Sequence, residues 1–100
     1  MIGWWIVISK GQADGTMPEK ENILTNWKTG TGGLRWLDDM ATQGKAKQLL
    51  NECYPNRYET SVADVLAIAE SLTAPVPALA PLLDGFSPSQ TLTIDAWDES

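Results

Sequence analysis

The first nine residues, MIGWWIVIS, are apolar on both sides of an extended chain, and this feature limits the possible folds most strongly. Ile6 and Ile8 alternate with Trp5 and Val7, so an extended backbone presents large apolar side chains on each of its two faces. Such a strand is typical of a sheet interior, and aromatic and β-branched residues favour a strand over a helix. The sequence therefore predicts an interior strand that ends at the glycine-containing residues 11–15.

Periodicity and helix boundary signals predict the remaining elements. Residues 16–19 (TMPE) form a capping box and predict a helix to about residue 28, with Ile23, Leu24 and Trp27 inward. The other expected elements are a helix at residues 34–43, a strand at 45–50, a turn at 54–57, a returning strand at 57–60, a helix after the Ser61 cap, a Pro-rich connector at 73–90 with one helical turn at 78–83, and a strand at 91–97.

The helix after Ser61 has the clearest apolar stripe in the chain. Its members follow one another at helical spacing: Val62, Val65, Leu66, Ala69 and Leu72. Because this spacing brings side chains onto one side of a helix, the sequence predicts that all five lie in the core.

The order of the elements predicts an α+β fold of the ferredoxin-like type. The order β-α-α-β-β-α-β is a split βαβ pattern, with an antiparallel sheet and helices on one face. Residues 91–97 alternate apolar with polar side chains, so this strand is expected at a sheet edge beside the first strand. If residues 45–60 are instead helical, a two-stranded sheet joins the termini. The chain length predicts a single domain, residues 1–100.

The composition argues against most catalytic and metal sites. The chain contains no His, so it lacks an imidazole base, a Ser-His or Cys-His pair and the usual zinc ligands. Cys53 is the single Cys and cannot form a disulfide within the chain. We therefore expect no enzyme activity, no cofactor and no metal. Because the sequence contains no signal-peptide pattern or long apolar span, a cytoplasmic protein is expected.

Charge is distributed unevenly along the sequence. All seven Lys and Arg residues lie at or before Arg57, and seven acidic residues follow it. The first 57 residues carry seven basic and six acidic groups, a net charge of +1, whereas the last 43 carry −7. An acidic surface attracts cationic proteins and repels phosphate backbones and anionic lipids. The sequence therefore favours a cationic partner protein over direct binding to nucleic acid or a membrane.

The alternation of the two terminal strands places a candidate binding site on the sheet face away from the helices. The residues expected there are Trp5, Val7, Thr93, Asp95 and Trp97, with Asp98 and Glu99 just beyond the strand. Two Trp residues on an otherwise polar face predict a contact platform for a partner. An equal alternative is that the connector at residues 73–90 folds back over this face.

The residues around the predicted turn form a second candidate contact. Tyr54, Arg57 and Tyr58 are of the types that anchor protein interfaces. In an equal alternative, Tyr54 and Tyr58 pack the turn, and Arg57 pairs with Glu59 or Asp95. The two alternatives assign the same residues either to a partner or to the interior.

Together these features predict a small acidic binding protein that inhibits a cationic, nucleic-acid-handling partner. Immunity proteins of bacterial toxins and phage-encoded inhibitors of defence nucleases or complexes share this charge and size, although no motif links the chain to them. The alternative is a small-ligand-binding protein or enzyme of the ferredoxin-like dimer type. In it, Trp5 and Trp97 would line a pocket, with Asp95 or Tyr58 as the polar group. A self-associating structural protein is a third possibility, so both a monomer and a homodimer remain open.

Overall fold

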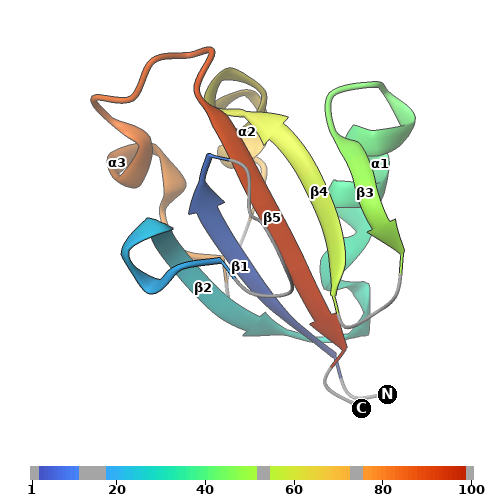
Figure 1. Ribbon diagram of the computed structural model, residues 1–100. Coiled ribbons are helices and arrows are strands. Elements are labelled where there is room, and N and C mark those ends of the chain that lie inside the picture. Colours follow the sequence, from blue (N-terminus) through green and yellow to red (C-terminus); the bar gives the residue numbers. More distant parts are fainter. Residues whose placement is uncertain (1–2, 12–17, 52–54, 73–75, 99–100) are drawn as a thin grey trace.

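The computed structural model describes residues 3–11, 18–51, 55–72 and 76–98 as a five-stranded antiparallel sheet with helices packed against it (Figure 1). The strands are β1 (Trp4–Lys10), β2 (Ile23–Thr29), β3 (Lys47–Asn51), β4 (Asn56–Ser61) and β5 (Thr91–Asp98). The helices are α1 (Arg35–Thr42), α2 (Val62–Ala69) and α3 (Leu79–Leu83), and two short 3-10 helices, η1 (Lys20–Asn22) and η2 (Thr31–Leu34), flank β2.

The structure confirms the α+β class, but its strand order differs from the ferredoxin-like one. The strands lie in the order β2-β1-β5-β4-β3, and each neighbouring pair is antiparallel. The last strand therefore lies at the centre of the sheet, between β1 and β4, and its expected position at an edge is wrong. β1 is an interior strand, as its two apolar faces predict. The hairpin β3–β4 confirms the strands expected within residues 45–60 and excludes the helical alternative.

The prediction of a helix at residues 16–28 is wrong for its second half, because residues Ile23–Thr29 form strand β2. Residues 16 and 17, which begin the capping-box pattern, lie outside the described residues. β2 pairs with the outer edge of β1, where Trp27 stands opposite Ile6. An interior strand needs a neighbour on each edge to pair its backbone groups, and the β-branched and aromatic residues of β2 suit this position.

The expectations for the other helices are confirmed. Ser61 caps α2, because its hydroxyl oxygen accepts a hydrogen bond from the backbone N–H of Asp64 at 3.2 Å. Gly44 follows α1 with a φ of 78°, and the N–H of Lys45 donates to the carbonyl of Met40 at 2.8 Å. The helical turn expected at residues 78–83 is α3.

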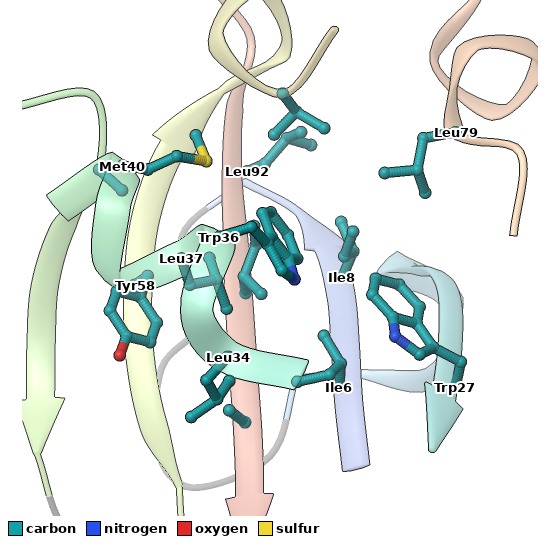
Figure 2. Packing of buried hydrophobic residues seen from close by; sticks show 14 of the residues in the cluster. Ile6, Ile8, Trp27, Leu34, Trp36, Leu37, Met40, Tyr58, Leu79 and Leu92 are labelled. Carbon is teal, nitrogen blue, oxygen red and sulfur yellow. The ribbon is translucent and has the colours of Figure 1, made fainter. Parts of the chain in front are cut away.

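The core lies between the helices and one face of the sheet (Figure 2). Trp36 of α1 points toward Ile8 of β1, and the indole of Trp27 stacks on that of Trp36 with ring centroids 6.4 Å apart. The expected contact of the helices with this face of the two terminal strands is confirmed, since their even-numbered residues belong to the same core cluster: Trp4, Ile6, Ile8, Leu92, Ile94 and Ala96.

Leu66 does not belong to this core, although its spacing predicts that it does. Val62 and Val65 of α2 are 1% and 0% exposed, whereas Leu66 is 38% exposed. Leu66 lies about 100° around the helix axis from Val65, and α2 contacts the sheet along only one side. The stripe is therefore correct for Val62 and Val65 and wrong for Leu66. Ala69 and Leu72 are partly buried and pack against the core.

Substitution of Leu66 by Ala is expected to lower the free energy of unfolding by less than about 1 kcal/mol, because much of the side chain already contacts water. Leu37→Ala is the matched comparison. Leu37 is completely buried, so its truncation is expected to cost about 2–5 kcal/mol. Urea denaturation of both variants measures the difference. Equal losses in the two variants would show that Leu66 is a core residue.

Candidate protein-binding surfaces

The sheet face away from the core brings together the two Trp residues that the sequence placed there. Trp5 of β1 stands directly opposite Trp97 of β5, and the ring centroids are 6.4 Å apart at an angle of 38°. The Trp5 indole N–H donates to Asn26 Oδ1 of β2 at 3.2 Å. Both Trp side chains are half-buried. They form a small aromatic platform near one end of β1 and β5.

The next row of this face holds a buried ion pair. Arg57 of β4 stands directly opposite Asp95 of β5, and Val7 of β1 stands on the other side of Asp95. Arg57 donates to the carboxylate twice, from Nε to Oδ1 at 2.7 Å and from Nη2 to Oδ2 at 3.2 Å. The two side chains are 5% and 0% exposed. A bidentate pair of this kind fixes the register of β4 on β5 and compensates the charge of each member.

Burial raises the pKa of Asp95 above its ordinary value of 3.8, and the hydrogen bond and charge of Arg57 offset only part of this effect. Taking a carboxylate out of water disfavours its charged form. The native state therefore binds the Asp95 proton more tightly than the unfolded chain does. The stabilisation from this difference is fully present below the unfolded pKa and is lost as the pH rises through the folded pKa.

The raised pKa of Asp95 predicts how the stability of the protein depends on pH. As the pH falls from 7 to about 4, the free energy of unfolding of the wild type is expected to increase relative to that of Asp95→Asn. The reason is that only the wild type takes up the Asp95 proton on folding. The other carboxylates are present in both proteins, so their contributions to the pH dependence cancel when the two free energies are subtracted. Urea denaturation at several pH values measures it. A difference that narrows on acidification would mean that the folded pKa lies below 3.8.

The structure places the other predicted contact residues in different surroundings. Tyr58 lies on the helix side of the sheet, is 1% exposed and donates from its hydroxyl to Asp38 Oδ1 of α1 at 3.2 Å. Asp98 is half-buried and stands opposite Trp4, so by strand alternation it belongs to the face of the sheet that the helices cover. Tyr54 and Glu99 lie outside the described residues. Tyr58 and Asp98 therefore do not join the aromatic platform of Trp5 and Trp97.

The middle of this sheet face is closed, which corrects the expectation of an open acidic surface. Val7 and Thr93 are each 1% exposed, and the Thr93 hydroxyl donates to the backbone carbonyl of Gly11 at 2.7 Å. The helical part of the connector, α3, lies on the other side of the sheet, where Leu79 and Leu83 pack into the core. Asp95 is internal and paired, so it is not an outward carboxylate.

The same geometry removes the residue set expected for a small-ligand site. Trp5 and Tyr58 lie on opposite sides of the sheet, and Asp95 is inaccessible to a ligand. Of the interior roles considered for the residues near the turn, the pairing of Arg57 with Asp95 is confirmed. Tyr58 is also interior, but it packs under α1 and bonds to Asp38. Both residues stabilise the fold from within.

A surface that sequence reasoning missed lies on the outer side of α2 and α3. We call it the α2/α3 surface. Its exposed apolar residues are Ala63, Leu66, Ala67, Ala78, Ala80, Pro81 and Leu82. Leu66 and Leu82, its largest exposed side chains, are 38% and 39% exposed. The signal in the sequence is the composition of α2, VADVLAIA, in which Asp64 is the only polar residue.

Two shallow grooves run along the sides of α2. One, of about 240 Å³, separates α2 from the end of α1 and the following segment, and it is lined by Met40, Gln43, Lys45, Asp64, Ala67, Ile68 and Ser71. The other, of about 180 Å³, separates α2 from α3 and is lined by Ala69, Glu70, Ala78, Leu79, Ala80 and Pro81. The exposed row of α2 forms a ridge between the two grooves.

Acidic residues border the α2/α3 surface. Asp64 lies in the first turn of α2, Glu70 follows its last turn, and Asp84 follows α3; Glu70 and Asp84 are exposed. The exposed cations of the described residues all lie elsewhere in the sequence, at Lys10, Lys20, Lys28, Arg35, Lys45 and Lys47. Only Lys45 among them lines a groove beside α2. The charge imbalance of the sequence therefore reappears as an acidic border around an apolar surface.

Within the described residues, acidic and Cys side chains form no group of three or more that could bind a metal ion. None of the helices in this part of the chain is long and apolar enough to cross a membrane. Comparison of the chain with models of protein families, with curated proteins and with solved structures gave no match.

Proposed function

We propose that this protein binds a cationic partner protein of the nucleic-acid-handling kind and acts as its inhibitor. The observation that carries the proposal is the separation of charge: α2 and α3 carry no Lys or Arg, and Asp64, Glu70 and Asp84 lie on or beside them. A surface of one sign attracts a partner of the opposite sign and raises the rate of association. A cytoplasmic site of action is part of this proposal, because the single Cys cannot form a disulfide within the chain.

Inhibition follows from competition for the same charge. A protein that handles nucleic acid has a positive cleft, and the phosphate backbone binds there largely through electrostatics. A small acidic protein that occupies the cleft blocks access to the nucleic acid. Toxins and defence nucleases or complexes are partners of this type, in the manner of immunity proteins and phage-encoded inhibitors.

Affinity capture with a competition step tests this function. The immobilised protein is incubated with a nuclease-treated bacterial lysate at about 0.05 M salt, and bound proteins are eluted either with salt at about 0.5 M or with duplex DNA. The proposal predicts that a basic, nucleic-acid-binding protein is retained at low salt and is released by both eluents. Retention of a protein that neither salt nor DNA displaces, or of acidic proteins only, would contradict it.

A further inference from the structure

We propose that the α2/α3 surface is the contact site for a basic amphipathic helix of the partner. This inference rests on the proposed function, because it assigns that function to a particular surface and a particular kind of segment. The largest exposed apolar side chains of this surface are Leu66 of α2 and Leu82 of α3, and its acidic residues are Asp64, Glu70 and Asp84.

Helix α2 is apolar around almost its whole circumference. Seven of its eight residues are apolar, yet Ala63, Leu66 and Ala67 of this helix are exposed. A helix that is apolar all round is normally buried on all sides, whereas a surface helix has a polar outer face. The inner side of α2 is covered by the sheet through Val62 and Val65. The outer side therefore has the composition of a face that a partner covers.

The shape of the α2/α3 surface suits a helical partner. The ridge of α2 stands between the two grooves, which lie on its α1 side and its α3 side. A partner helix recognised through a groove contributes side chains at positions i, i+3, i+4 and i+7. Such side chains can enter the groove between α2 and α3, whose lining is apolar apart from Glu70. Leu82 then contacts the partner beside that groove.

The acidic residues beside the α2/α3 surface favour a basic partner over other molecules that could cover it. Lys or Arg residues flanking the apolar side of the partner helix meet Glu70 and Asp84 at the border. A second copy of this chain is a poor occupant, because a two-fold interface places the same patch on both subunits and brings acidic border against acidic border. Nucleic acid is repelled by the same residues. A basic amphipathic helix satisfies both the apolar centre and the acidic border.

The test uses a helical peptide of about 18 residues made of Leu and Lys, with Leu on one side, and a scrambled peptide of the same composition. Isothermal titration at about 0.05 M salt compares the wild type with Leu66→Ser/Leu82→Ser. The matched control is Leu49→Ser on β3, since Leu49 is 41% exposed and lies on a different part of the molecule. Circular dichroism confirms that each variant remains folded.

The inference predicts that the Leu66→Ser/Leu82→Ser variant binds the amphipathic peptide at least about tenfold more weakly than the wild type, while Leu49→Ser binds as the wild type does. The scrambled peptide is expected to bind weakly to all of them. A second pair tests the border: Glu70→Gln/Asp84→Asn is expected to reduce the salt dependence of binding more than Glu19→Gln/Glu21→Gln does. All four of these acidic residues are exposed.

Three results would overturn the inference. One is the absence of binding to the amphipathic peptide. Another is binding that the Leu49→Ser control weakens as much as the α2/α3 variant does. The third is sedimentation that shows a dimer which Leu66→Ser/Leu82→Ser dissociates, because a second copy would then cover the surface. If capture from the lysate still yields a salt-sensitive cationic protein in any of these cases, the proposed function stands and only the assigned surface is wrong.

Discussion

Substitution of Asp95 by Asn is expected to lower the free energy of unfolding by about 3–5 kcal/mol at neutral pH. The substitution replaces one of the two carboxylate oxygens that accept from Arg57, which is 5% exposed, by an amide NH2 group that cannot accept a hydrogen bond. The guanidinium N–H left without an acceptor is buried and has lost its hydration, so its full desolvation penalty remains. The position of the pair makes the loss larger, because β4 and β5 meet directly at Arg57 and Asp95.

Urea denaturation of three variants measures this effect. Asp84→Asn removes an exposed carboxylate and is the matched control, with an expected change within about 0.5 kcal/mol. The double variant Arg57→Met/Asp95→Leu replaces both charges with apolar side chains, so it is expected to recover much of the loss. If Asp95→Asn is no more harmful than Asp84→Asn, the ion pair is not a buried structural contact.

Substitution of Trp36 by Ala is expected to cost about 3–5 kcal/mol. Trp36 is 9% exposed, stacks on Trp27 and fills the space between α1 and β1 (Figure 2). Removing the indole leaves a cavity, and a shift of the eight-residue helix α1 is expected to close this cavity only in part.

A second substitution separates volume from hydrogen bonding. Trp36 Nε1 is buried and has no hydrogen-bond partner among the described residues, so Trp36→Phe loses volume but also removes an unsatisfied donor. We expect Trp36→Phe to cost clearly less than Trp36→Ala. Urea denaturation of both variants provides the comparison. Equal losses would show that the indole N–H forms a hydrogen bond in solution.

Much of the fold could be predicted from local patterns. The interior position of β1 follows from its two apolar faces, and α2 follows from the Ser61 cap and the helical spacing of Val62 and Val65. The hairpin of β3 and β4 follows from turn residues between two short extended segments. These signals lie within a few residues of the structure that they specify, so no knowledge of the tertiary fold is needed.

The errors arose where a distant contact decides the structure. Residues 16–19 resemble a helix start, but Ile23–Thr29 pairs along the free edge of β1, and this pairing lies outside any local window. Asp95 gave β5 the alternation of an edge strand, because a polar residue normally faces water. Its partner Arg57 is 38 residues away, and with it the carboxylate can lie at the sheet centre.

The candidate site was predicted less well than the fold. Alternation alone brings Trp5 opposite Trp97, and the structure confirms that they meet. Alternation does not show whether a face is open, so the burial of Asp95 and Thr93 could not be predicted. Leu66 illustrates the reverse error: an apolar residue at helical spacing was assigned to the core, although its exposure is what makes the α2/α3 surface apolar.

Chemical-shift mapping shows directly which surface of the protein binds the peptide. The protein, labelled with ¹⁵N, is titrated with the Leu/Lys amphipathic peptide, and the shifts of all backbone amides are followed. If the peptide binds the α2/α3 surface, the largest changes are expected in α2 and α3, around Leu66 and Leu82, and amides of β2 and β3 are expected to change little. Changes that centre instead on Trp5 and Trp97, on the opposite side of the sheet, would contradict it.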